Sequence, residues 1–175
     1  MNSDYNSVLA FDPGGRNCGY ANIVYDPHSK EFYFEDIGDI ELTCDEFGGR
    51  IYELTRRIYD QIDRYPCDFI CYENVLFGRN VTNAFNTAKI IGGIELVAWD
   101  QTVACVGYPP QKIKKLITGN GRATKDEMRQ AIGKLIDAEK SDEYEDWYTK
   151  ASHHIIDACA IGIVGIQQFD PEKDG

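Results

Sequence analysis

Hydrophobic and polar positions along the chain predict a short β-rich region followed by alternating helices and strands. Residues 7–11, 19–25 and 31–40 are rich in β-branched and aromatic side chains and are separated by turn residues. They predict a three-stranded antiparallel meander. In residues 45–64 apolar side chains recur at steps of three and four, which is typical of an amphipathic helix, and Pro66 ends that pattern.

The second half of the chain continues this alternation. Residues 67–72 and 103–108 are short apolar runs that predict buried strands. Residues 81–101 predict a long helix, in which the pair Gly92-Gly93 permits either a bend or the close approach of another helix. Further helices are expected over residues 111–117, 125–138 and 152–169, with an acidic surface loop over residues 140–150.

The order of these elements predicts the fold class. Three strands, a helix, a strand, a helix, a strand and further helices predict an α/β fold with a mixed five-stranded sheet flanked by helices. This order resembles the ribonuclease H-like order. Thr124 and Glu127 have the spacing of a capping box and predict a helix start at residue 125. With 175 residues, a single domain over residues 1–175 is expected.

Composition narrows the class of protein. Hydrophobic residues make up 43% of the chain and charged residues 27%, which is typical of a globular protein. No apolar run reaches the roughly 20 residues that span a bilayer, and the start of the chain lacks the basic flank of a secretory signal. The six cysteines form no CxxC pair, which argues against a zinc site or a disulfide framework. We therefore expect a soluble cytoplasmic protein with reduced thiols and no membrane partner.

The charge is unevenly distributed. A net charge of −11 argues against a polyanionic partner, because long-range electrostatic steering would be repulsive. Residues 111–134, however, contain seven basic and two acidic residues. The basic ones are Lys112, Lys114, Lys115, Arg122, Lys125, Arg129 and Lys134. This segment is either a solvated helical face, which is common, or a surface that binds phosphates.

Four residues with metal-ligating side chains stand at the ends of predicted elements. Asp12 follows the first strand, and Glu73 follows the apolar run of the fourth. Taken alone, each has a simpler explanation as a turn-opening or hydrogen-bonded acid. His154 and Asp157 are three positions apart on the last helix and so share a face, whereas His153 points about 100° away. Carboxylates with one imidazole suit Mg²⁺ or Mn²⁺, so the set predicts a metal site.

Four segments carry a resemblance to a known family. VLAFDPGGRNCGYANIV, YENV, IKKLITGNGRATK and HHIIDACAIGI follow one another along the chain. They resemble segments of the RuvC-type resolvases, which cut four-way (Holliday) DNA junctions. In that order, they correspond to the family's first strand and turn, its glutamate motif, its basic segment and its last-helix metal motif. The resemblance covers nearly the whole chain and keeps the family's order.

This resemblance implies roles for particular residues. The metal-binding catalytic residues would be Asp12, Glu73, His154 and Asp157. Lys114 and Lys125 would contact the DNA backbone near the scissile phosphate. Further phosphate contacts are expected from Lys112, Lys115, Arg122 and Arg129. The family has an aromatic residue shortly after the glutamate that stacks on junction bases; Leu76 stands at the expected place and Phe77 comes one later, so Phe77 is the candidate.

The implied activity is that of a structure-selective endonuclease with two Mg²⁺ or Mn²⁺ ions per site. It would resolve a four-way junction by paired symmetric nicks that leave 5′-phosphate and 3′-hydroxyl ends. Two matched nicks in a nearly two-fold junction favour a homodimer. The resemblance places the dimer contact on the helix at residues 81–101, where Phe85, Ile91, Gly92 and Trp99 serve either the dimer or the monomer core.

Three alternatives stand beside this expectation. A nuclease of the same fold that acts on flaps, forks or structured RNA would share the metal site. An actin-like ATPase also has an aspartate followed by glycines, but it needs a duplicated domain for which 175 residues leave no room. A catalytically inactive junction-binding module is the third, and the complete set of four metal-ligating residues argues against it.

Overall fold

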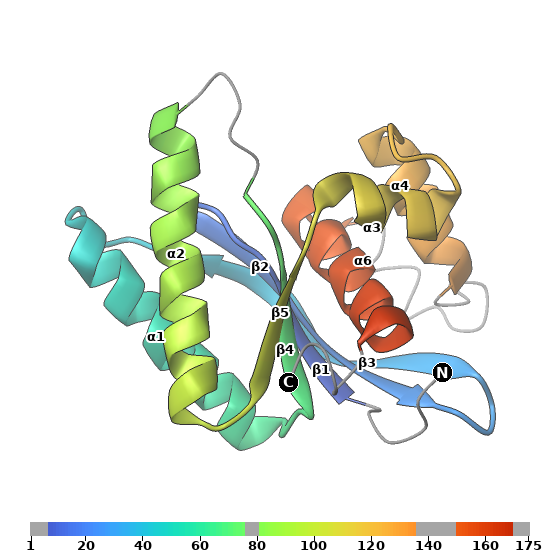
Figure 1. Cartoon of the computed structure of the whole chain (residues 1–175), viewed down its shortest axis with the longest axis horizontal. Coiled ribbons are helices and arrows are strands. Elements are labelled where there is room, and N and C mark those ends of the chain that lie inside the picture. The colour runs from blue at the N-terminus through green and yellow to red at the C-terminus, as the bar shows by residue number, and fades with distance from the viewer. Residues whose placement is uncertain (1–6, 76–80, 136–149, 170–175) are drawn as a thin grey trace.

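A mixed β-sheet forms the centre of the chain. The computed structural model describes residues 7–75, 81–135 and 150–169 (Figure 1). The strands are β1 (Ser7–Asp12), β2 (Asn17–Asp26), β3 (Glu31–Glu41), β4 (Phe69–Glu73) and β5 (Ala104–Tyr108). They form one five-stranded sheet with the order β3-β2-β1-β4-β5. β1, β2 and β3 pair antiparallel, as the predicted meander requires. β4 pairs parallel with both β1 and β5, so the sheet is mixed, as predicted.

Helices cover both faces of this sheet. The helices are α1 (Phe47–Arg64), α2 (Val81–Asp100), α3 (Pro110–Thr118), α4 (Lys125–Leu135) and α6 (His153–Gln168). Figure 1 shows α1 and α2 side by side on one face, and α6 on the other with α3 and α4 beside it. Within the described ranges no helix is long and apolar enough to cross a membrane.

Both faces of the central strands are buried. Successive strand side chains point to opposite faces, so β1 contributes to two cores. Leu9 and Phe11 pack with residues of α1 and α2, and Val8 and Ala10 pack with residues of α6. This explains why β1 and β4 are nearly continuous apolar runs rather than alternating ones. By the same alternation Asp12, the last residue of β1, faces α6.

Several local signals are confirmed. The capping box of α4 is formed: Glu127 Oε2 accepts from the Thr124 N–H at 2.7 Å, and Thr124 Oγ1 accepts from the Glu127 N–H at 3.3 Å. The paired glycines do not break α2. Instead, a Cβ on Gly93 would lie 3.1 Å from Cγ2 of Ile51, so Gly93 permits close packing against α1, whereas Gly92 has no neighbour within 4 Å of such a Cβ.

Some predicted boundaries differ or lie outside the described residues. The helix expected from residue 45 begins at Phe47, after an extended Glu46. Residues 136–138 of the expected helix 125–138 and nearly all of the expected acidic loop 140–150 are not among the residues described. All six cysteines are free thiols, in agreement with the absence of a disulfide framework.

Candidate active site

The carboxyl ends of two neighbouring strands bring Asp12 and Glu73 together. β1 and β4 are parallel, and Phe11 is paired with Tyr72. Asp12 and Glu73 are the next residues of the two strands and therefore lie at the same edge of the sheet. Phe11 and Tyr72 face α1 and α2, so the two acids face the layer that contains α6.

The start of α6 supplies the other two candidate residues. Ser152 caps the helix, and its Oγ accepts a hydrogen bond from the Ile155 N–H at 3.2 Å. Two residues further, Nδ1 of His154 lies 2.6 Å from Oδ2 of Asp12. Asp157 follows one turn later and is partly buried, whereas His153 is exposed to solvent. The helix therefore presents His154 and Asp157 to the sheet edge.

The carboxylates perturb one another. Burial, together with the nearby charges of Asp12 and Asp157, raises the pKa of Glu73 to about 7. Burial and then the charge of Asp12 raise the pKa of Asp157. The hydrogen bond to Asp12 raises the pKa of His154, because it favours the charged imidazolium. Residues from β1, β4 and α6 thus form one electrostatic cluster.

The four side chains gather but are not arranged around one point. Within residues 7–75, 81–135 and 150–169, no three His, Cys, Asp or Glu side chains are placed as ligands of a common metal ion. Asp12 and His154 instead contact each other directly. The donor set still fits a hard divalent cation, because neighbouring buried carboxylates that repel one another are stabilised by added positive charge.

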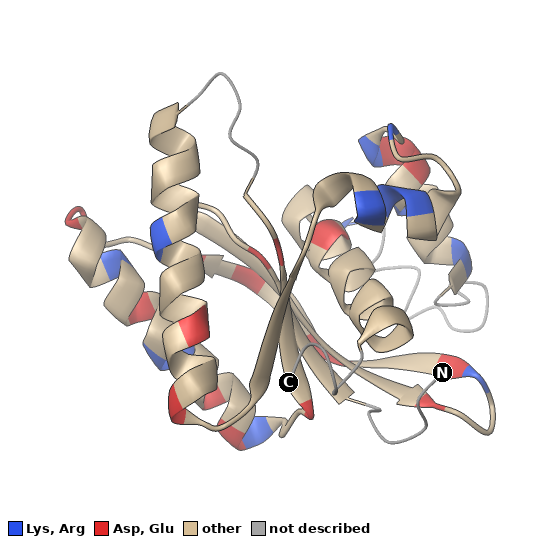
Figure 2. Ribbon diagram, viewed as in Figure 1, with Lys and Arg blue, Asp and Glu red and all other residues tan. Residues whose placement is uncertain are grey.

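Two of the predicted lysines lie beside this cluster. The positive charge of Lys114 offsets part of the rise in the pKa of Glu73 and of Asp157. That of Lys125 offsets part of the rise in the pKa of Asp157. Lys114 Nζ also donates to the Ala123 carbonyl at 3.0 Å, which ties α3 to the turn before α4. Figure 2 shows basic positions of α3 close to the acidic position on α6.

The other basic residues of this segment differ in their surroundings. Lys115 and Arg122 are exposed, and Lys112 Nζ lies 5.1 Å from the centre of the Tyr108 ring. Arg129, predicted as a phosphate contact, directs Nη2 to the Ala151 carbonyl at 2.7 Å and so holds the chain that leads into α6. Phe77, the candidate for base stacking, lies outside the described residues.

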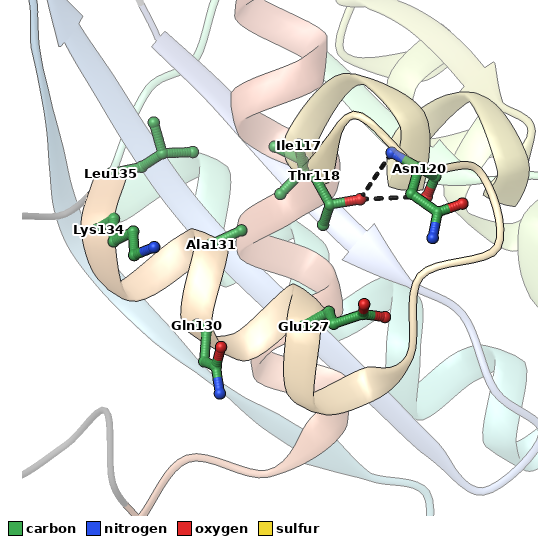
Figure 3. Close-up of a pocket in the computed structure, with 8 residues that line it drawn as sticks. All are labelled: Ile117, Thr118, Asn120, Glu127, Gln130, Ala131, Lys134 and Leu135. Atoms are coloured by element: carbon green, nitrogen blue, oxygen red, sulfur yellow. Dashed lines mark hydrogen bonds between the residues drawn. The ribbon is translucent and has the colours of Figure 1, made fainter.

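Two surface hollows lie away from the cluster. One of about 400 Å³ lies between α3 and α4 (Figure 3). Its lining residues are Ile117, Thr118, Asn120, Glu127, Gln130, Ala131, Lys134 and Leu135. The other, of about 720 Å³, lies beside Trp99 and Cys105. None of the four candidate active-site residues lines either hollow.

Sequence reasoning did not identify two residues that border the site. Gly19 on β2 lies against the backbone of His154 at the start of α6, where a side chain would not fit. Asp39 on β3 accepts a hydrogen bond from Ser152, the residue that caps α6. Asp39 stands in no sequence motif that predicts chemistry, and Gly19 lies in the first segment of the family resemblance without a role of its own. Only the pairing register of the meander brings them to Asp12, so no local signal could have revealed them.

The sheet order and the acids at the ends of β1 and β4 place the chain in the ribonuclease H-like class of folds. Its structure aligns with that of Thermus thermophilus RuvC with a TM-score of 0.77 and 18% identity, covering 91% of this chain and 93% of that one. The same Thermus protein has been solved in complex with a Holliday junction substrate.

Sequence comparison identifies the family. The family described as crossover junction endodeoxyribonuclease RuvC matches residues 8–164. A protein of that name from Sulfurovum sp. (strain NBC37-1) is 28% identical over 167 residues, 95% of this chain and 99% of the relative. One from Helicobacter pylori (strain J99) is 27% identical over 164 residues, 94% of this chain and 98% of the relative. The chain belongs to the RuvC family.

Proposed function

We propose that this chain is a divalent-metal-dependent endonuclease that resolves four-way (Holliday) DNA junctions by paired symmetric nicks. The observation that carries the proposal is the cluster of Asp12, Glu73, His154 and Asp157 with Lys114 and Lys125 beside it. Membership of a family whose relatives are named crossover junction endodeoxyribonucleases supports junction DNA as the substrate. The expected products have 5′-phosphate and 3′-hydroxyl ends.

The acidic cluster is the proposed site for Mg²⁺ or Mn²⁺. Asp12, Glu73 and Asp157 would supply carboxylate oxygens and His154 an imidazole nitrogen. When bound, two such ions lower the pKa of the attacking water and stabilise the leaving oxygen of the phosphodiester. Glu73 must give up its proton to serve as a ligand, and a cation favours this because it stabilises the ionised form. Without bound cations these carboxylates repel DNA, so cleavage requires the metal.

The basic residues of α3 and α4 are proposed to hold the DNA backbone. Lys114 and Lys125 stand nearest the carboxylates and would bind the phosphates that flank the cleaved bond. Lys112, Lys115 and Arg122 would extend this contact, and Phe77 is the proposed stacking residue. Screening confines electrostatic repulsion to roughly 8 Å at physiological salt. A local basic surface therefore binds DNA despite the net charge of −11.

A homodimer is the proposed assembly, because two identical sites match the two-fold symmetry of the junction. The outer face of α2 carries large apolar side chains that are exposed in the monomer: Trp99 is 85% exposed, Leu96 62% and Phe85 58%. Their spacing places them on one stripe of the helix. Of the other two predicted candidates, Ile91 is only 8% exposed and packs in the core, and Gly92 is exposed but has no side chain. We therefore assign Phe85, Leu96 and Trp99 to the dimer contact.

Cleavage of a substrate panel tests this proposal. We expect a synthetic four-way junction to be cut into nicked duplexes in Mg²⁺ or Mn²⁺, and flaps, forks, structured RNA and plain duplexes to be cut much more slowly. Asp12→Asn should abolish cleavage while junction binding persists. Asp60→Asn, an exposed acid on the far layer, is the matched control and should cut normally. Undiminished cleavage by Asp12→Asn, or faster cleavage of flaps, forks or RNA, would contradict the proposal.

A further inference from the structure

We propose that Asp39 is a positioning residue that fixes the start of α6 through Ser152. The two candidate metal ligands on this helix, His154 and Asp157, then depend on Asp39 for their place beside Asp12. This inference rests on the proposed function, because it concerns how the metal-binding residues are held in position.

The register of the meander places Asp39 in line with Asp12. Asp12 is paired with Gly19 of β2, and Gly19 is paired with Asp39 of β3. Residues directly opposite one another in antiparallel strands point to the same face of the sheet. Asp12, Gly19 and Asp39 therefore form a row across three strands, on the face that α6 covers.

The first turn of α6 lies across this row. At one end, Nδ1 of His154 contacts Oδ2 of Asp12 at 2.6 Å. In the middle, the backbone of His154 packs so closely on Gly19 that a Cβ at this position would overlap the His154 carbonyl group. At the other end, Ser152 Oγ donates to Oδ1 of Asp39 at 3.0 Å. The helix start is thus attached on both sides of a close backbone contact.

The hydrogen bond to Asp39 also orients the cap of the helix. A serine hydroxyl has one proton, and in Ser152 that proton is donated to Asp39. A lone pair of the same oxygen then faces the Ile155 N–H, which it accepts at 3.2 Å. Asp39 therefore favours the hydroxyl orientation that caps α6. Arg129 holds the preceding residue, Ala151, by donating to its carbonyl oxygen.

This attachment matters because metal ligands act only when their supporting groups hold them in place. Loss of an outer residue that orients ligands costs about 10- to 100-fold in metal affinity or activity in well-studied metal sites. Asp39 contacts a residue two positions before His154, so a change at Asp39 moves the ligands on α6 without removing any of them. The phosphate-contacting lysines lie on α3 and α4 and are not attached to Asp39.

Three variants and a control test the inference. Asp39→Ala and Ser152→Ala each remove the hydrogen bond, whereas Asp39→Asn keeps an oxygen acceptor for the serine hydroxyl. Glu41→Ala is the matched control, because Glu41 is an exposed acid two residues further along β3. Mn²⁺ affinity measured by calorimetry, junction affinity, kcat, and amide hydrogen exchange of Ile155 in the metal-free protein are compared with the wild type.

We expect both alanine variants to bind Mn²⁺ about tenfold more weakly and to lower kcat by a similar factor, with junction affinity within about twofold. In both, the Ile155 amide should exchange faster. The double variant should have the same Mn²⁺ affinity and kcat as Ser152→Ala alone. Asp39→Asn and Glu41→Ala should behave like the wild type. If Asp39→Ala does not fold, Ser152→Ala removes the same hydrogen bond from the helix side; because it also removes the acceptor of the Ile155 N–H, it is judged by Mn²⁺ affinity and kcat rather than by amide exchange.

Several results would overturn the inference. Unchanged Mn²⁺ affinity and kcat in the alanine variants would show that the contact does not position the ligands. An Asp39→Asn variant as impaired as Asp39→Ala would assign the effect to charge rather than to the hydrogen bond. If the wild type itself neither binds Mn²⁺ nor cuts a junction, the proposed function fails. The exchange rate of the Ile155 amide, which needs no metal, still decides whether Asp39 fixes the start of α6.

Discussion

Replacing Glu73 by glutamine is expected to stabilise the metal-free protein at neutral pH. Burial and the charges of Asp12 and Asp157 raise the pKa of Glu73 from 4.5 to about 7. Between these two values the folded state holds a proton that the unfolded chain has released. The free energy of unfolding therefore falls as the pH rises through this window. Glutamine has nearly the same shape but does not ionise, so the variant does not share this loss.

The size of the effect follows from the two pKa values. Each pH unit between them contributes about 1.4 kcal/mol, which gives a difference of about 3 kcal/mol between variant and wild type at pH 8. At pH 5 most of this difference is absent, and about 1 kcal/mol remains. In a protein of this length about 3 kcal/mol corresponds to a melting temperature roughly 6–12 °C higher.

Urea unfolding of both proteins in EDTA at pH 5, 6, 7 and 8 measures this difference directly. Effects of other titrating groups largely cancel between the two curves, so a difference that grows with pH reports on Glu73. Glu35→Gln, at an exposed position of β3, is the control and should give a flat difference. Added Mg²⁺ should stabilise the wild type more than the variant. A difference that stays flat with pH, or a wild type more stable than the variant at pH 8, would refute the reasoning.

Three further predictions concern the packing of α6, DNA binding and assembly. Gly19→Ala should lower the free energy of unfolding by about 1–3 kcal/mol in urea titration, because its Cβ would overlap the backbone of His154; unchanged stability would contradict this. Lys125→Ala should weaken junction binding and reduce the slope of log affinity against log salt by about one, and an unaltered slope would remove Lys125 from the interface. Trp99→Glu should shift the protein from dimer to monomer in sedimentation, because a charge would enter the proposed apolar contact; a dimer that persists would place the interface elsewhere.

Most helices and strands could be predicted from the sequence because their signals are local. The apolar spacing of α1 and the capping box of Thr124 and Glu127 depend on residues within a few positions of one another. The ends of β1 and β4 were also predictable, and the parallel pairing of these strands then brings Asp12 and Glu73 to one edge. Boundaries were less certain, as the start of α1 at Phe47 illustrates, since an extended residue before a helix leaves little trace in the pattern.

Surface and core could not be separated by helix spacing alone. In α2, Ile91 and Trp99 both belong to apolar positions of a helix that is hydrophobic on more than one side. Ile91 packs in the core with residues of the sheet and α1, whereas Trp99 is 85% exposed. Likewise Arg129 and Lys114 stand in one basic segment, yet their nitrogens donate to the carbonyls of Ala151 and Ala123. These partners depend on how α3 and α4 pack beside α6.

The sequence by itself determined which residue types are available and on which elements they stand: acids at two strand ends, a histidine and an aspartate on one helix face, and lysines on the helices between. Tertiary structure alone decided that His154 meets Asp12 and that Asp39 holds Ser152. The physical reason is one of range. Helix periodicity and caps arise from neighbours in sequence, whereas the row of Asp12, Gly19 and Asp39 arises from strand register and from a helix more than 100 residues away along the chain.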